Sequence, residues 1–260
     1  MARSPEELAQ IAFEVAGEAA KLLYEGFRKR PTISEKGRAD LVTEYDLASE
    51  RLIRERLREK TPELAIVGEE QGGTPAPGNG LTWYCDPLDG TTNFAHGHFF
   101  FCVSLGVAEA GLPIAGAVVA PALATHWRAF RGGPALRNDE PCRVSETSEL
   151  RQALVATGFP TDRSDPATNN FSSFTRVKPL VRGIRRCGSA AIDLCLVADG
   201  TYDAYWERRL NAWDLMAGSA LVLAAGGMLS ALDGTPPDLS VGNVLASNGR
   251  IHRDLSNVID

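Results

Sequence analysis

The chain carries a distinctive acidic stretch at residues 86–94: Asp86-Pro87-Leu88-Asp89-Gly90-Thr91-Thr92-Asn93-Phe94. It follows the apolar residues Trp83-Tyr84-Cys85, which predict a buried strand that ends at Asp86. Pro87 removes a backbone donor and Gly90 permits a tight bend, so both aspartates and the Leu88 carbonyl can point to one spot. Hard cations such as Mg²⁺ prefer such oxygen ligands. A surface turn is the alternative, because Asp, Pro and Gly are common turn residues.

Two further segments place acids at the ends of apolar elements. Gly68-Glu69-Glu70 follows the short apolar strand Ala65-Ile66-Val67, and Trp213-Asp214 opens an apolar helix. Either acid also has an ordinary explanation: a solvated strand end for Glu69, and a helix-terminus acid favoured by the dipole for Asp214. Together with Asp86 and Asp89 they would concentrate negative charge at one edge, which bound cations would neutralise.

Composition limits the class of protein. The chain has 260 residues, 44% apolar and 23% charged, with a formal charge of −6, which does not suit a sequence-independent nucleic-acid binder. The five cysteines form no CxxC pair, which favours buried free thiols over disulfides or zinc. Neither a signal peptide nor an apolar run of ~18 residues is present, so we expect a cytoplasmic enzyme.

Helices and strands are expected in blocks rather than in regular alternation. Apolar periodicity predicts helices over 5–27, 44–60, 190–198 and 212–225, and the runs from 99 to 130 suggest a three-stranded meander. Residues 31–40 are polar and predict a loop. The pattern favours an α+β fold of two closely packed lobes, residues 1–140 and 141–260, with the junction within 131–150.

At this point the sequence resembles the inositol monophosphatase family. The resemblance is carried by five segments in the family's order and spacing: residues 40–46 (DLVTEYD), Gly68-Glu69-Glu70, residues 86–94, residues 188–191 (GSAA) and residues 213–218 (WDLMAG). It implies a layered α-β-α-β-α sandwich of the sugar-phosphatase type. It also implies a Mg²⁺-dependent, usually Li⁺-sensitive phosphatase, commonly a homodimer.

The resemblance assigns roles by position. Two or three Mg²⁺ ions would be held by Glu69, Asp86, Asp89, Asp214 and the Leu88 carbonyl. Asp46 and Thr91 would sit beside the attacking water, and we hypothesise that Glu69 and Thr91, with Asp46 behind Thr91, orient and deprotonate it in a reaction that needs no covalent intermediate. The amides of Gly90 and Thr91 would hold the phosphate, and Asp89, Gly188, Ser189 and Ala190 would line the substrate pocket. A close helix start is the alternative for the segment from Gly188.

The alcohol is less well determined. Thr92-Asn93-Phe94 weakens a preference for adenosine bisphosphate, whose specific relatives usually place a basic residue and Glu there. Glu207 stands seven residues before Asp214, where inositol monophosphatases bind ring hydroxyls; a surface ion pair with Arg208 or Arg209 is the alternative. Arg209 and Asn211-Ala212 depart from the family pattern between Glu207 and Asp214, the segment that bears on substrate preference.

Three functions therefore remain open. The leading one is an inositol-1-monophosphatase-like phosphomonoesterase with no membrane and no direct nucleic-acid partner. A histidinol-phosphatase or fructose-1,6-bisphosphatase is the second. A regulatory partner of the transcription machinery is the third, because some bacterial relatives associate with it.

Overall fold

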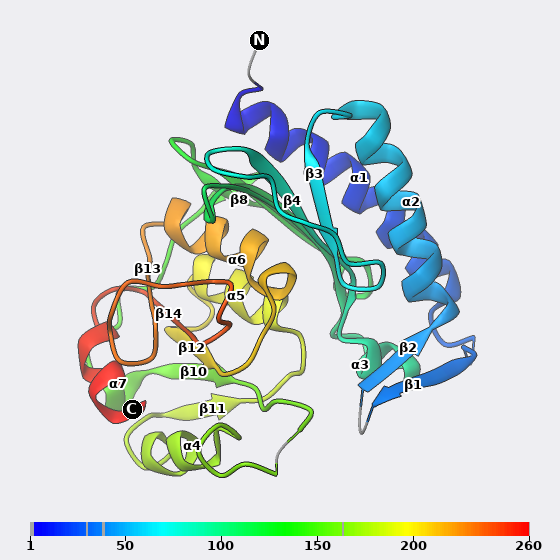
Figure 1. Cartoon of the computed structure of the whole chain (residues 1–260). Coiled ribbons are helices and arrows are strands. Elements are labelled where there is room, and N and C mark those ends of the chain that lie inside the picture. Colours follow the sequence, from blue (N-terminus) through cyan, green and yellow to red (C-terminus); the bar gives the residue numbers. More distant parts are fainter. Residues whose placement is uncertain (1–2, 30, 38–39, 163, 260) are drawn as a thin grey trace.

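Two large β-sheets and three layers of helices alternate through the structure, a computed structural model that describes residues 3–29, 31–37, 40–162 and 164–259 (Figure 1). The layers run α1/α2, seven-stranded sheet, α5/α6, five-stranded sheet and α4/α7. The predicted α+β, α-β-α-β-α architecture is confirmed. Among the described residues, no helix is both long and apolar enough to span a membrane.

The first layer consists of α1 (Pro5–Gly26) and α2 (Glu44–Lys60). Ser4 caps α1 by accepting a hydrogen bond from the Glu7 amide at 3.1 Å, and Pro5 occupies the first turn, as the sequence predicted. Thr43 and Asp46 form a reciprocal capping box at the start of α2. The apolar stripes of both helices pack on one face of the first sheet.

The first sheet has the strand order β3-β4-β5-β6-β7-β8-β9, in which only β3 and β4 are parallel. Its strands are β3 (Ala65–Gly68), β4 (Leu81–Asp89), β5 (Cys102–Glu109), β6 (Leu112–Ala120), β7 (Thr125–Phe130), β8 (Ala135–Arg137) and β9 (Glu140–Cys142). The predicted meander is β5, β6 and β7. A 3₁₀ turn, Pro121–Leu123, joins β6 to β7.

The middle layer consists of α5 (Ala190–Ala198) and α6 (Ala212–Ala224), which are apolar around almost their whole circumference because a sheet covers each side. The second sheet has the order β11-β10-β12-β14-β13. Its strands are β10 (Leu154–Thr157), β11 (Gly183–Arg185), β12 (Ala204–Glu207), β13 (Met228–Ser230) and β14 (Val244–Ser247). The outer helices α4 (Phe171–Val177) and α7 (His252–Ile259) close its far face, and a 3₁₀ turn, Leu150–Gln152, precedes β10.

Two local expectations were wrong. Part of the expected loop at 31–40 pairs as an antiparallel hairpin of β1 (Ile33–Gly37) and β2 (Asp40–Thr43), which backbone hydrogen bonds stabilise without an apolar pattern. The strand expected to end at Asp86 continues to Asp89, with a register shift between these two residues. Such a bulge accommodates Pro87, which cannot donate to the strand ladder.

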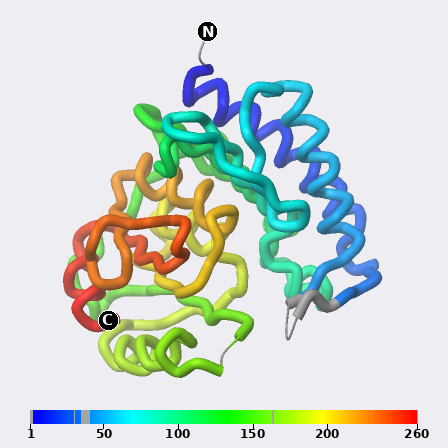
Figure 2. Tube along the Cα trace, in the orientation of Figure 1, coloured from blue at the N-terminus to red at the C-terminus, as the bar shows by residue number. Residues whose placement is uncertain are grey.

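The two halves of the chain occupy opposite ends of the molecule in Figure 2. The first sheet ends at Cys142 and the second begins at Leu154, on either side of an extended segment. The division into lobes 1–140 and 141–260 stays a proposal, and its expected boundary falls within β9 rather than in the segment between the sheets.

Candidate functional site

The end of β4 presents the two aspartates of the acidic stretch. Asp86 is 2% exposed and Asp89 is 9% exposed. The bulge between them places both carboxylates at the same edge of the sheet. The Leu88 amide donates to Asp86 Oδ1 at 3.0 Å, and Ser49 on α2 donates to the Pro87 carbonyl at 2.8 Å. The aspartates are therefore held in a fixed bulge at the end of β4 and do not lie in an exposed turn.

The N-terminus of α5 holds the Asp89 carboxylate. Oδ2 accepts hydrogen bonds from the Ser189 hydroxyl and the Ala191 amide, both at 2.7 Å. Burial raises the pKa of Asp89 to about 6, although these donors oppose the rise. The segment from Gly188 is therefore a helix start, and its Ser189 hydroxyl orients Asp89.

Asp214 lies in the first turn of α6, next to Asp86. The Asn211 amide donates to Asp214 Oδ2 at 2.6 Å, and the carboxyl groups of Asp214 and Asp86 lie within hydrogen-bonding reach of each other. Burial, followed by repulsion from Asp89, raises the pKa of Asp214 to about 7. The ordinary helix-terminus explanation is thus incomplete, because Asp214 also faces the acids of β4.

Repulsion among the acids is strongest at Asp86. Burial, then the charges of Glu69, Asp89 and Asp214, raise its pKa well above the usual range. Within the described parts of the chain, no Lys or Arg forms an ion pair with Asp86, Asp89 or Asp214. The structure thus brings three predicted aspartates and Glu69 near one another without a protein cation between the aspartates.

Glu69 stands on the turn that follows β3. Its amide donates to the Cys85 carbonyl of β4 at 3.2 Å. Glu50 of α2, which is fully buried, accepts hydrogen bonds from the amides of Glu70 (2.6 Å) and Gln71 (3.1 Å) and from Arg54 Nε (2.6 Å). The sequence did not single out Glu50, because a charged residue within a helix is usually solvated.

Thr91 lies between Asp46 and the acidic bulge. Its hydroxyl is 2.9 Å from Asp46 Oδ1 and 3.0 Å from the Leu88 carbonyl. The other Asp46 oxygen, Oδ2, accepts from the Thr43 amide at 2.8 Å and the Thr43 hydroxyl at 2.6 Å. Burial raises the pKa of Asp46, and these hydrogen bonds oppose the rise. The predicted pairing of Asp46 with Thr91 is present.

Gly90 lies close to two backbone carbonyls, those of Phe100 and Gly188. It adopts φ +93°, and a Cβ there would lie 2.9 Å from the Phe100 carbonyl oxygen and 3.3 Å from the Gly188 carbonyl oxygen. Asn93, which the sequence did not assign a role, donates from Nδ2 to the carbonyls of Phe100 (2.6 Å) and Cys187 (2.9 Å). Asn93 thereby fixes the acidic stretch against the segment that precedes α5.

Glu207 ends β12 inside the molecule and is 8% exposed. Tyr205, two residues earlier on the same face of the strand, donates to Glu207 Oε2 at 2.5 Å. Burial raises the pKa of Glu207 to about 7, against the effect of the Tyr205 hydroxyl. The alternative of a surface ion pair with Arg209 is wrong: Arg209 instead contacts Asp162, at 3.7 Å.

Two adjoining cavities contain these groups. One, of about 330 Å³, lies beside Glu69, Gly90, Thr91 and Asn93. The other, of about 130 Å³, lies beside Asp89, Ser189, Asp193, Glu207 and Asp214. Both are also lined by Arg186 and Gly188, so they form one site with an acidic inner end. Gly158 lines the smaller cavity, and a Cβ there would lie 1.9 Å from Glu207 Oε2.

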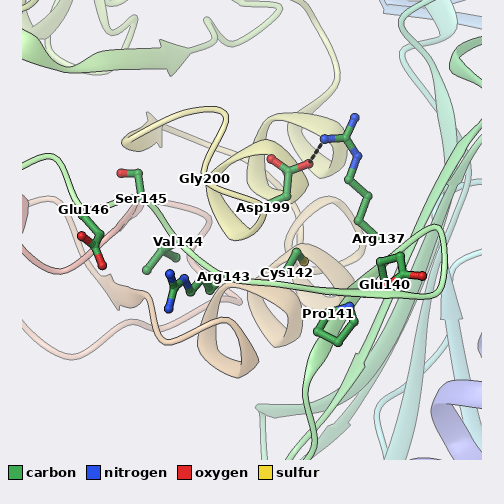
Figure 3. Close-up of a pocket in the computed structure, with 10 residues that line it drawn as sticks. All are labelled: Arg137, Glu140, Pro141, Cys142, Arg143, Val144, Ser145, Glu146, Asp199 and Gly200. Atoms are coloured by element: carbon green, nitrogen blue, oxygen red, sulfur yellow. Dashed lines mark ion pairs between the residues drawn. The ribbon is translucent and has the colours of Figure 1, made fainter.

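A larger cavity, of about 520 Å³, lies apart from this site (Figure 3). It is lined by Arg137, by residues 140–146 and by Asp199 and Gly200, and contains none of the predicted site residues. Its Asp199 pairs with Arg137 at 3.2 Å and accepts from Trp127 Nε1 at 3.0 Å. These contacts give its carboxylate a structural role.

The oxygen donors at the end of β4 suit a hard cation. Carboxylates and a backbone carbonyl are the ligands of Mg²⁺ and related ions, and the mutual repulsion at Asp86 shows that positive charge would be stabilised there. In the part of the chain that the structure describes, no three His, Cys, Asp or Glu side chains are arranged as a group that could hold a metal ion. The metal assignment is therefore taken up below as a proposal.

Comparison with known proteins identifies the family. The Inositol monophosphatase family model matches residues 4–259. The chain belongs to the inositol monophosphatase family. The inositol-1-monophosphatase of Synechocystis sp. is 43% identical over 98% of this chain and 91% of its own length. The structure of the inositol monophosphatase from Anabaena (Nostoc) sp. is 39% identical, with a TM-score of 0.90, covering 98% of this chain and 95% of that one.

Another relative carries a different name. The Nus factor SuhB of Pseudomonas aeruginosa is 38% identical over 98% of this chain and 96% of its own length. As an inositol monophosphatase family member, the present protein is a phosphoric monoester hydrolase, and the predicted phosphatase activity is confirmed at this level.

Proposed function

We propose that the protein hydrolyses the phosphate ester of a small polyol, such as inositol monophosphate, in a Mg²⁺-dependent reaction. The observation that carries this proposal is the adjoining pair of cavities. Asp89 of β4, Asp214 of α6 and the buried Glu207 line the smaller cavity, and Glu69 and Thr91 line the adjoining one. Members of this family generally depend on metal ions, and the oxygen donors here are of the type that Mg²⁺ prefers.

The ions would be held by Glu69, Asp86, Asp89 and Asp214, together with the Leu88 carbonyl. Two or three Mg²⁺ would neutralise these carboxylates and the substrate phosphate, lower the pKa of a water molecule and stabilise the leaving oxygen. The protein supports this set with rigid contacts: Ser189 and Ala191 orient Asp89, and Glu50 fixes the turn that carries Glu69.

Thr91 and Asp46 would handle the proton of the attacking water. The Thr91 hydroxyl lies 2.9 Å from Asp46 Oδ1, so a proton received by Thr91 can be passed toward a buried carboxylate. Asp46 Oδ2 is occupied by Thr43, which leaves Oδ1 for this task. Glu69, at the edge of the same cavity, would orient the water from the other side, and the amides of Gly90 and Thr91 would hold the phosphate.

Glu207 supports a polyol as the leaving alcohol. A carboxylate accepts two hydroxyl hydrogen bonds, and Tyr205 occupies only Oε2. Asp89 and the Gly188–Ala190 segment line the same cavity, where small side chains let a ring approach the backbone. Homodimer formation, Li⁺ sensitivity and a cytoplasmic location belong to the proposal by family likeness.

A phosphate-release screen over a panel of phosphomonoesters tests this function. The panel should contain myo-inositol 1-phosphate, fructose 1,6-bisphosphate, histidinol phosphate and adenosine 3′,5′-bisphosphate, each with Mg²⁺ and with EDTA. We expect the inositol ester to give the highest kcat/KM, and only with Mg²⁺. If histidinol phosphate or the fructose bisphosphate is preferred at least about tenfold, the corresponding alternative replaces the polyol assignment.

A regulatory role is the second candidate, supported by the similarity to a relative named Nus factor SuhB. A pull-down with the Asp89→Asn variant would test it, because that variant separates binding from turnover. Specific recovery of transcription proteins at physiological salt would support the role, and recovery equal to that of a bead control would exclude it.

A further inference from the structure

Asp193 stands out among the acidic side chains of the second lobe. It lies in the first turns of α5, is 2% exposed and lines the inner cavity with Glu207. Among the described residues, its Oδ1 is the one buried carboxylate oxygen that no donor contacts. A buried carboxylate oxygen without a partner is unfavourable, so its presence on a cavity wall requires an explanation.

No contact within the described part of the protein explains why Asp193 is buried. Other buried acids of this lobe have donors: Asp203 accepts from the Ser145 hydroxyl at 2.5 Å and the Leu154 amide at 2.6 Å, and Glu207 accepts from Tyr205. The N-terminus of α5 is capped by Ser189, whose hydroxyl accepts from the Ile192 amide at 3.3 Å. The helix therefore needs no second capping acid, and Asp193 is not explained as one.

The surroundings define the chemistry of a ligand for Asp193. Burial, followed by repulsion from Glu207 and Asp89, raises the pKa of Asp193, whereas Arg186 lowers it. Two adjacent acceptors favour a ligand with hydrogen-bond donors. Arg186, which also lines this cavity, offsets part of the negative charge of these acids, so a ligand needs no positive charge of its own and neutral hydroxyl donors suffice.

We propose that Asp193 is a second hydroxyl-recognition residue, which acts beside Glu207 and selects substrates that carry at least two hydroxyl groups on the leaving alcohol. This inference rests on the proposed polyol phosphatase function and deepens it. The unsatisfied Oδ1 is kept in the unliganded protein because a substrate hydroxyl satisfies it in the complex. An ester that lacks hydroxyls cannot do so, and the site discriminates against it.

The experiment compares kcat/KM for myo-inositol 1-phosphate and cyclohexyl phosphate, a ring of the same size without hydroxyls. Asp193→Leu removes both acceptor oxygens, and we expect it to reduce kcat/KM for the inositol ester by about 10- to 100-fold. Cyclohexyl phosphate should change by less than about threefold. Asp193→Asn, which keeps one acceptor, should restore part of the selectivity.

Thermal unfolding serves as the folding control. Asp193→Leu should melt at or above the wild-type temperature, because an unpaired carboxylate is replaced by an apolar side chain of similar size. Asp203→Asn is the matched control: it changes a buried aspartate outside the cavity, so it should lower the Tm and leave the ratio of the two kcat/KM values unchanged.

The outcomes separate this inference from the proposed function. A wild-type enzyme that prefers the inositol ester, with the same preference in Asp193→Leu, would overturn the role of Asp193 alone. Equal losses on both esters would also overturn it, since they would indicate a structural or metal-related effect. No wild-type preference for the inositol ester would overturn both. A wild-type preference for an amino-alcohol phosphate that Asp193→Leu abolishes would overturn the hydroxyl assignment.

Discussion

Replacement of Glu50 by Gln tests how the protein holds the turn that carries Glu69. Glu50 is fully buried and accepts three hydrogen bonds, from Arg54 and from the amides of residues 70 and 71. Arg54 also donates to the Gly72 carbonyl. One ion pair thus connects α2 to both sides of the turn after β3. Gln keeps the shape of the side chain but removes its charge.

The effect on stability follows from the burial of both partners. The Arg54 side chain is 8% exposed, so the variant leaves a guanidinium charge in the interior without a counter-charge. Breaking a buried pair in this way costs about 3–5 kcal/mol. For a chain of this size, 1 kcal/mol corresponds to about 2–4 °C, so the Tm should fall by roughly 6–20 °C. Loss of a supporting partner should also weaken Mg²⁺ activation by about 10- to 100-fold.

The assay combines thermal unfolding, followed by circular dichroism, with a Mg²⁺ titration of phosphate release. Glu59→Gln is the matched control, because it removes a carboxylate from the same helix that pairs with Arg56 at the surface. An exposed pair of this kind contributes little, so the control should match the wild type in both measurements. The reasoning is refuted if Glu50→Gln melts within about 1 °C of the control, or if both require the same Mg²⁺ concentration for half-maximal rate.

Three other changes test separate parts of the site. Gly158→Ala should displace Glu207, since the new Cβ would lie 1.9 Å from Oε2; kinetics should show about a tenfold loss of kcat/KM on inositol 1-phosphate and no loss on cyclohexyl phosphate. Thr91→Val should reduce kcat by at least about 100-fold with little change in KM, whereas Thr91→Ser should retain most of the rate; equal rates in all three proteins would exclude the proton-transfer role. Glu207→Gln should flatten the pH dependence of stability in EDTA. The folded-state pKa of Glu207 is about 7, above the ordinary glutamate value of 4.5, so the folded protein binds the additional proton between these values. The stability from this group is complete below about pH 4.5 and is lost as the pH rises through 7, which urea unfolding from pH 4.5 to 8 would measure. If the wild type and Glu207→Gln show the same dependence of the unfolding free energy on pH, the raised pKa of Glu207 is contradicted.

Much of the fold was predictable because it depends on local patterns. Helical periodicity and the Ser4-Pro5 start predicted α1, and the apolar runs after residue 99 predicted the meander. The hairpin of β1 and β2 was missed because both strands are short and β1 is mostly polar. The continuation of β4 to Asp89 depends on pairing with β5, which a turn-like sequence of Asp, Pro and Gly conceals.

The site was predictable where acids follow apolar strands, as at Asp86 and Glu69. Residues whose surroundings depend on the assembled fold could not be predicted from the sequence. Asp193 looks like one polar residue in an apolar helix, and only the packing of α5 beside Glu207 gives it a cavity to face. The Tyr205–Glu207 contact could have been found from the sequence, since residues two apart on a strand share a face.

Phosphate release from myo-inositol 1-phosphate, measured for the wild type and Asp89→Asn over a Mg²⁺ titration and in EDTA, tests the central claim most directly. Asp89 connects the proposed metal ligands to the substrate cavity. We predict that the wild type turns over only with Mg²⁺ and that Asp89→Asn loses nearly all turnover at every Mg²⁺ concentration. A wild-type rate that persists in EDTA, or an Asp89→Asn variant with the wild-type rate at saturating Mg²⁺, would contradict the account.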